Sequence, residues 1–143
     1  MLEYSHIMPS LQDIREFFYE TNDDFDIPLD QKLNIEEYTQ KLYTYSDFFL
    51  CYEDDKIIGM LCCYTNRPPD AYISHVCVKS QYQGKGIFKE LFKKVEDYCR
   101  DNYITSISLE VGCDNLVARS AYEKVGFVLI RGLSDSLILR KDI

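Results

Sequence analysis

The chain has 143 residues, of which 46% are hydrophobic and 28% charged, so it is long enough for one globular domain and too apolar for a disordered chain. Sixteen basic residues against twenty-four acidic ones give a net charge of −8. A field of that sign repels polyanions, which argues against a nucleic-acid-binding protein. We therefore expect a single domain over residues 1–143 that binds no nucleic acid.

The sequence does not predict a membrane protein or an exported one. Its longest mainly apolar run, residues 57–64, is far shorter than the roughly 20 residues that a membrane span needs. The first residues have neither the basic start nor the apolar core of a signal peptide. The six cysteines include the neighbours Cys62 and Cys63 but no Cys-x-x-Cys pair, which predicts reduced, buried thiols in a cytoplasmic protein. Since His6 and His75 are the only histidines, we expect no metal site.

The hydrophobic pattern changes period along the chain. Ser10 is placed to cap a first helix, and an aspartate-rich loop over residues 22–34 separates this helix from a second one. In chain order the pattern predicts helices at about 11–18 and 35–42, strands at 48–53, 56–64 and 71–78, a helix at 87–99, a strand at 105–111, a helix at 116–125, and strands at 127–131 and 136–139. This order predicts a mixed α/β sheet covered by helices.

A glycine turn joins the strand at 71–78 to the helix that begins at residue 87. Gly84 and Gly86 flank Lys85, and the N–H groups at the start of the helix lack intrahelical partners. Together with the helix dipole and the lysine, they form a site that suits a pyrophosphate. The spacing is not that of a P-loop, and Lys89 stands where the dinucleotide fingerprint needs a third glycine. A glycine turn that binds no ligand is the alternative.

A second informative segment, residues 115–127, follows the next predicted strand and reads Asn-Leu-Val-Ala-Arg-Ser-Ala-Tyr-Glu-Lys-Val-Gly-Phe. In this order the two segments resemble the GNAT superfamily of acyl-CoA-dependent N-acetyltransferases, in its stand-alone bacterial type. The resemblance extends over about residues 48–130. It implies the α/β (α+β) GNAT fold: a central mixed, mostly antiparallel sheet of six to seven strands, flanked by four helices and splayed between its two middle strands.

The resemblance also implies acetyl-CoA as co-substrate. The family motif Gln/Arg-x-x-Gly-x-Gly/Ala fits from Gln81 or from Gln83. We prefer Gln83, which keeps the usual distance from the strand, although Phe88 then replaces a small residue at the start of the helix. Backbone N–H groups of the turn would bind the phosphates, and the strand before it would bind the pantetheine arm. The cofactor-binding residues implied are Val76, Cys77, Val78, Gln83, Gly84, Lys85, Gly86, Ile87, Phe88, Asn115 and Tyr122.

Three residues are candidates for acid and base catalysis. Tyr122 matches the family's tyrosine that protonates the departing thiolate, which suits a phenol of pKa near 10 and a thiol of pKa about 8.5; a tyrosine packed on the core is the alternative. Glu110, twelve residues earlier, resembles the family's general base, but a glutamate there can equally bind a structural water or a helix N-terminus. His75 is the rival base, with a hydrogen-bonded core histidine as its alternative, and a water chain without a single base is a third option.

The acceptor we expect is the primary amine of a small molecule. The loop between the first two helices holds several carboxylates that would attract a cationic amine, although a solvated loop on an acidic protein explains them equally well. These residues are Asp23, Asp24, Asp26 and Asp30, followed by Glu36 and Glu37. The chain also looks like stand-alone bacterial GNAT proteins of which some are linked to surface polysaccharide synthesis, which suggests an amino sugar.

Two alternatives to this function stay open at the level of sequence. One is a non-catalytic CoA-binding or assembly module that keeps the GNAT fold without turnover. The other is an N-acetyltransferase that acts on a protein or a peptide. As partners we expect the amine acceptor and, as one form of assembly, a second copy of the chain, but neither nucleic acid nor a membrane.

Overall fold

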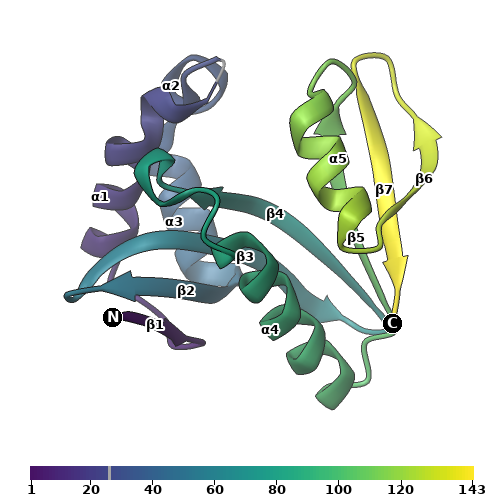
Figure 1. Ribbon diagram of the computed structural model, residues 1–143, viewed down its shortest axis with the longest axis horizontal. Helices are drawn as coiled ribbons and strands as arrows, with labels where there is room; N and C mark the ends of the chain where they lie inside the picture. Colours follow the sequence, from purple (N-terminus) through teal and green to yellow (C-terminus); the bar gives the residue numbers. More distant parts are fainter. Residues whose placement is uncertain (26) are drawn as a thin grey trace.

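The computed structural model describes residues 1–25 and 27–143 (Figure 1), and within them a seven-stranded sheet is accompanied by five α-helices. Two short 3₁₀ helices, η1 (Asn22–Asp24) and η2 (Ser80–Tyr82), lie in connections. The other elements are β1 (Leu2–Ser5), α1 (Leu11–Thr21), α2 (Leu29–Lys32), α3 (Ile35–Tyr45), β2 (Asp47–Glu53), β3 (Lys56–Arg67), β4 (Asp70–Val78), α4 (Ile87–Asp101), β5 (Ser106–Gly112), α5 (Leu116–Lys124), β6 (Val128–Gly132) and β7 (Ser136–Asp142).

Every helix and strand predicted from the sequence is present, mostly with shifted ends, and besides the two 3₁₀ helices one strand and one α-helix were not predicted. Strand β1 has only four residues, too short for its alternation to predict a strand, and it pairs with the edge of β2. Helix α2 is a single turn that follows Pro28 inside the predicted loop, so the described part of the chain has five α-helices where four were expected. Strands β3 and β7 run three residues further than predicted: β7 stays paired with β5 over its extra length, and β3 ends at the pair of Arg67 with Asp70 of β4.

The sheet is mixed and mostly antiparallel, as predicted. Its strands lie in the order β1-β2-β3-β4-β5-β7-β6, and β4 with β5 is the parallel pair. In these two strands only residues Asp70–Ile73 of β4 pair with residues Ser106–Leu109 of β5. Beyond those pairs β4 and β5 diverge, as Figure 1 shows, which confirms the splay expected in the middle of the sheet.

A β-bulge in β4 coincides with the point of divergence. Ile73 pairs with Cys63 of β3 and His75 pairs with Cys62, so Ser74 is an extra residue in β4. A bulge bends its strand and increases the local twist. Ile73 is also the last residue of β4 that pairs with β5. The strand therefore leaves its parallel neighbour where the extra residue turns it away.

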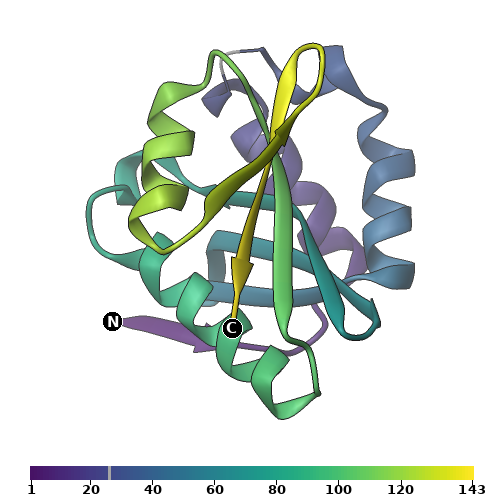
Figure 2. The same ribbon diagram turned by 90° about the vertical axis from the view of Figure 1, so that its right-hand side faces the viewer.

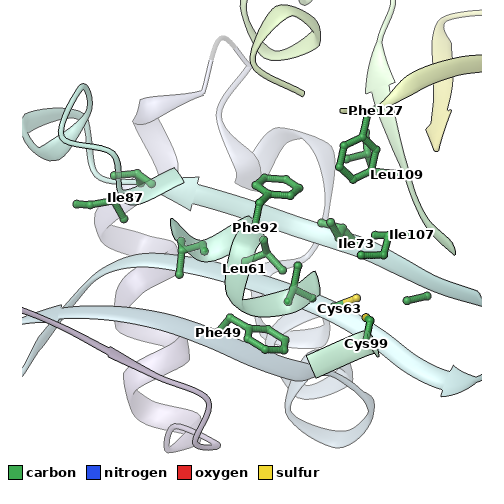
Figure 3. Close-up of a cluster of buried hydrophobic side chains, with 14 of the residues drawn as sticks. Phe49, Leu61, Cys63, Ile73, Ile87, Phe92, Cys99, Ile107, Leu109 and Phe127 are labelled. Atoms are coloured by element: carbon green, nitrogen blue, oxygen red, sulfur yellow. The ribbon is translucent and has the colours of Figure 1, made fainter. Parts of the chain in front are cut away.

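Helices cover both faces of the sheet and bury two hydrophobic cores. In Figure 2, α4 and α5 lie on one side of the strands and α1 and α3 on the other. Figure 3 shows part of the first core, in which Ile87, Phe92 and Cys99 of α4 face residues of the strands. The second core lies between the sheet and α1, with Phe17 and Phe18 fully buried. The sheet is thus anchored on both faces.

His75 belongs to the second core because the bulge reverses the alternation of β4. Its ring lies 4.8 Å from the ring of Phe18, 5.8 Å from that of Phe25 and 6.0 Å from that of Tyr38, measured between centroids. Its Nε2 atom is buried and has no hydrogen-bond partner among the described residues. Burial lowers the pKa of this imidazole from 6.5 to about 4, so the ring is neutral in the folded protein at pH 7.

This buried histidine predicts a loss of stability at mildly acidic pH. Between pH 6.5 and 4 the unfolded chain binds a proton at residue 75 that the folded chain does not, so the free energy of unfolding falls as the pH falls through that range. From pH 7 to pH 5 we expect His75 to account for about 2 kcal/mol of the decrease. Urea denaturation at both pH values should show a smaller decrease for His75→Gln than for the wild type. The exposed His6 supplies the control, since His6→Gln should keep the full decrease. Equal decreases in the wild type and in His75→Gln would contradict this account.

Candidate active site

A cavity of about 370 Å³ lies where β4 and β5 diverge. Its walls are the end of β4, the glycine turn, the start of α4, one face of α5, and η1 with the residue that follows it. Most of the predicted cofactor-binding residues line it: Val76, Cys77, Val78, Gln83, Gly84, Gly86, Ile87, Phe88, Asn115 and Tyr122. The tertiary structure thus brings the two sequence segments that resemble the GNAT family to one cavity.

The end of β4 presents unpaired backbone groups to this cavity. The N–H of Lys79 donates to the carbonyl oxygen of Ile58 at 2.9 Å, which fixes the phase of the antiparallel ladder between β3 and β4. Because the hydrogen-bonding direction alternates along a strand, the backbone groups of Val76 and Val78 point away from β3, toward the side that β5 has left. The Val78 carbonyl accepts a hydrogen bond from the Gln83 amide at 3.1 Å. The backbone groups of Val76 remain available to a ligand that lies along the strand.

The turn between β4 and α4 depends on its two glycines. Gly84 has φ +81° and Gly86 has φ +80°. This left-handed backbone conformation is energetically unfavourable for any residue that has a side chain. Gly86 is the N-cap of α4, and no side chain caps the helix there. The free N–H groups of the first turn, with the positive end of the helix dipole, therefore form an anion-binding surface at the cavity wall.

Lys85 does not line the cavity, although it lies between these glycines. Its ammonium nitrogen lies 5.3 Å from the centre of the Tyr82 ring, in a cation–π contact. The Tyr82 hydroxyl in turn donates to the carboxylate of Glu53 at 2.8 Å. The lysine side chain is therefore held against the Tyr82 ring, and its backbone N–H is its predicted contribution to binding.

Tyr122 and Asn115 face the cavity from α5. Asn115 is the N-cap of α5, where its Oδ1 accepts from the Ala118 N–H at 3.2 Å. The Tyr122 ring packs 5.7 Å from Phe88 and 5.9 Å from Phe92, between centroids. Burial, helped by the neighbouring Cys77 thiol, raises the pKa of Tyr122 to about 12. Its phenol is therefore protonated at neutral pH and able to donate a hydrogen bond into the cavity.

Phe88, the bulky residue in the family's small-residue position, does not fill the phosphate turn. Its ring lies 4.7 Å from that of Phe92, between centroids, and contacts Tyr122 on the cavity wall. No heavy atom lies within 4 Å of an ideal Cβ position at Gly84 or at Gly86, so the space beside the turn is open. The side chain of Phe88 thus adds apolar wall to the cavity and leaves the backbone N–H groups of the turn uncovered.

The predicted bases Glu110 and His75 do not line the cavity. Glu110 is exposed on β5, one residue beyond the last pair with β4, and accepts a hydrogen bond from the Ser136 hydroxyl at 3.0 Å. His75 is enclosed in the second core, with the Phe25 ring among its neighbours. Phe25 itself is part of the cavity wall. Of the two side chains, only that of Glu110 is open to solvent.

The acidic loop contributes one carboxylate to the cavity, that of Asp24. Glu36 is occupied elsewhere, because it accepts hydrogen bonds from Arg15 and from Tyr19, each at 2.8 Å. Asp26, also expected in this rim, lies outside the described residues. Burial raises the pKa of the Cys77 thiol to about 12, and the Asp24 carboxylate raises it further as a smaller cause.

Several cavity residues were not predicted. They are Phe25, Tyr82, Val117, Ala118 and Ala121. Those on α5 could have been found, since helical spacing from Asn115 places 118, 121 and 122 on one face. Phe25 and Tyr82 reach the cavity from separate connections, and no sequence spacing links them to it.

The cysteines were also expected to be reduced and buried. The six cysteines are free thiols, and Cys113 is exposed, which corrects the expectation that all of them are buried. Cys113 lies in the turn between β5 and α5, outside the core. Among residues 1–25 and 27–143, no group of three or more His, Cys, Asp or Glu side chains is placed to hold a metal ion. No helix in this described part of the chain has the length and apolar character that crossing a membrane requires.

Curated relatives match the chain at low sequence identity. N-acetylaspartate synthetase of Xenopus tropicalis is 28% identical over 116 residues, which are 75% of this chain and 42% of that protein. N-alpha-acetyltransferase 30 of Schizosaccharomyces pombe is 29% identical over 107 residues, 68% of this chain and 71% of its own length. The chain thus spans less than half of the Xenopus protein.

Solved structures share the fold over nearly the whole chain. The PaiA N-acetyltransferase of Thermoplasma acidophilum, in complex with coenzyme A, superposes with a TM-score of 0.79 at 18% identity, covering 100% of this chain and 99% of its own. The ribosomal-protein-S18-alanine N-acetyltransferase of Escherichia coli gives a TM-score of 0.80 at 18% identity, covering 100% and 94%. At these identities the likeness is one of fold.

The match to a family extends over most of the chain and includes both halves of the cavity. A sequence model of the acetyltransferase (GNAT) family matches residues 10–127, a range that contains the end of β4, the glycine turn and α5. The fold, the splayed strands and the glycine turn agree with that match. The chain belongs to the acetyltransferase (GNAT) family.

Proposed function

We propose that residues 1–143 act as one N-acetyltransferase domain, which transfers the acetyl group of acetyl-CoA to a primary amine by direct attack within a ternary complex. One observation carries the proposal: a single cavity joins the free edge of β4 to the uncapped N-terminus of α4. An extended amide-bearing chain suits the first feature and a pyrophosphate suits the second. Coenzyme A contains both groups in sequence, and it is bound in the related Thermoplasma structure.

In this proposal the pantetheine arm adds to β4 as a short extra strand. The backbone groups of Val76 bond its amides, because β5 no longer pairs there. The pyrophosphate accepts hydrogen bonds from N–H groups between Gly84 and Phe88. The thioester then lies deeper in the cavity, toward Tyr122 and Cys77, which places the acetyl carbon beside the phenol.

Tyr122 is the proposed general acid. The amine nitrogen attacks the thioester carbonyl carbon, a C–N bond forms as the C–S bond breaks, and the leaving thiolate takes the phenolic proton of Tyr122. Burial keeps this phenol protonated, since its pKa is raised to about 12. Cys77 is a poor candidate for an acyl-carrying nucleophile, because the same kind of burial raises its pKa and keeps the thiol protonated.

Glu110 is the proposed base for the attacking amine, acting directly or through water. It accepts the nitrogen proton, and exchange with solvent restores the proton of Tyr122. Its carboxylate is exposed at the splay and is oriented by the Ser136 hydroxyl. His75 is the weaker candidate, because its ring is enclosed by Phe18 and Tyr38 and its lowered pKa makes it a weak base.

The proposed acceptor is a small molecule with a primary amine, an amino sugar among the candidates. The Asp24 carboxylate on the cavity wall supports a cationic acceptor, because it attracts an ammonium group to the site. A peptide α-amine is the second candidate. It is supported by the Schizosaccharomyces pombe relative, which is named as an N-alpha-acetyltransferase.

The first experiment tests binding and turnover together. We expect saturable binding of acetyl-CoA to the purified protein in calorimetry, with desulfo-CoA and adenosine 3′,5′-bisphosphate as controls. Release of free thiol should then accelerate with some member of a panel of amino sugars, diamines and peptides with free N-termini. Binding without turnover on any amine would favour a non-catalytic CoA-binding module. Absence of acetyl-CoA binding at millimolar concentration would overturn the proposed function.

Removal of the proposed acid should separate chemistry from binding. Tyr122→Phe keeps the ring packed against Phe88 but lacks the proton for the leaving thiolate, so we expect kcat to fall by about 10²-fold or more. The Kd for acetyl-CoA should stay within about twofold. Tyr103→Phe, at an exposed position, is the matched control and should keep wild-type turnover. Wild-type turnover in Tyr122→Phe would exclude Tyr122 as the acid.

The assignment of the base can be tested through Glu110 and the residue that orients it. Glu110→Gln removes the proton acceptor but keeps the Ser136 contact available, and we expect kcat to fall by about 10²-fold with unchanged acetyl-CoA binding. Ser136→Ala should lower kcat less than Glu110→Gln does. The Glu110 carboxylate remains, and only the hydrogen bond that orients it is lost. The pH–rate profile of Glu110→Gln should lose its acidic limb. A profile unchanged from that of the wild type would transfer the base role to His75 or to water.

A further inference from the structure

A second hollow, the lysine groove, lies beside the proposed acetyl-CoA cavity. It has a volume of about 660 Å³ and is bounded by α4, the end of α5 and β7. Gly86, the N-cap of α4, lines both the groove and the cavity. Four lysines line it: Lys89 and Lys93 of α4, Lys124 at the end of α5, and Lys141 of β7. The glycine turn thus borders both the proposed acetyl-CoA cavity and a groove lined by lysines.

The two carboxylates in this groove are already neutralised. Glu96 accepts from the ammonium of Lys141 at 2.5 Å and from Arg100 at 3.4 Å. Glu90 pairs with Lys94 at 3.7 Å, a lysine outside the groove. The positive charges of the other lysines are therefore not cancelled by these two carboxylates.

Three lysines remain without a counter-charge. No carboxylate in the described part of the chain lies within 4 Å of the ammonium groups of Lys89, Lys93 or Lys124. Lys89 and Lys93 are four residues apart on α4 and so lie on one face of that helix, while Lys124 reaches the groove from α5. In a chain with net charge −8, this local excess of cations favours a multiply charged anion.

Lys141 of β7 contacts the segment that follows α5. Besides its pair with Glu96, its ammonium donates to the Val125 carbonyl at 2.7 Å. Gly126 has φ +105°, and a Cβ there would lie 2.8 Å from the Cε of Lys141. The end of α5 and β7 are therefore closely joined, which holds Lys124 opposite α4.

We propose that Lys89, Lys93 and Lys124 bind the 3′-phosphate of acetyl-CoA and so make the protein selective for CoA over dephospho-CoA. The proposal rests on the proposed function. With the pantetheine arm in the cavity and the pyrophosphate at the glycine turn, the part of the cofactor that remains is the 3′-phosphorylated adenosine. The groove begins at the same turn, at Gly86, and supplies three uncompensated cations. A phosphate monoester carries nearly two negative charges at pH 7 and suits such a cluster.

Calorimetric titrations with CoA and with dephospho-CoA test this assignment. We expect the wild type to bind CoA about tenfold tighter than dephospho-CoA at low salt, and this ratio should shrink as salt is added. A triple variant, Lys89→Gln with Lys93→Gln and Lys124→Gln, should bind both ligands with equal Kd. Lys32→Gln is the control: it removes one positive charge from α2, outside the groove. This variant should keep the wild-type ratio of the two dissociation constants.

The outcomes separate this inference from the proposed function. Equal affinity of the wild type for CoA and dephospho-CoA would overturn the role of the lysine groove and leave the acetyl-CoA cavity standing. A triple variant that kept the tenfold ratio would also overturn it. If the wild type bound neither ligand, the proposed function would fall together with the inference. Because the wild-type comparison can overturn the inference without any variant, the inference stays falsifiable even if the triple variant fails to fold.

Discussion

The candidate site depends on one local constraint, the extra residue Ser74 in β4. The bulge has two effects at once. It bends β4 away from β5 after Ile73, which opens the sheet and leaves backbone donors and acceptors without a partner strand. It also moves His75 to the side of α1 and α3, where a neutral imidazole packs among aromatic rings. Backbone hydrogen-bonding capacity inside a protein is costly to leave unused, so an opened sheet is a natural receptor for an extended ligand.

The end of β4 is held in place by an ion pair as well as by the sheet. Lys79 follows the strand directly, and its side chain, only 9% exposed, pairs with Glu20 of α1 at 3.2 Å. Burial alone would raise the pKa of Glu20, but the hydrogen bonds from Lys56 and Lys79 outweigh it and lower the pKa. The carboxylate is therefore charged at neutral pH, and α1 is tied to the strand that leads into the glycine turn. This link fixes the turn relative to the cavity, where a small displacement would misplace the phosphate donors.

Charge is distributed unevenly around the site, in spite of the overall excess of acid. The glycine turn and the lysine groove are cationic or rich in N–H donors, whereas the opposite wall carries the carboxylate of Asp24. An anionic cofactor and a cationic acceptor would thus be attracted to different sides of one opening. The rings of Phe88 and Tyr122, which contact each other at 5.7 Å between centroids, add apolar surface to the wall of the same cavity.

Sequence by itself determined the local features of this protein. Positive φ at Gly84 and Gly86 needs glycine, and the apolar stripe of α4 needs only helical spacing, so the turn, the helix and the family were all predictable from neighbouring residues. The tertiary structure decided which side chains meet. The bulge at Ser74 follows from pairing with β3, and the enclosure of His75 follows from packing against α1 and α3. The lysine groove joins residues from α4, α5 and β7. None of these is encoded at a fixed spacing along the chain, because register and packing depend on segments that are distant in sequence and become neighbours only when the sheet forms.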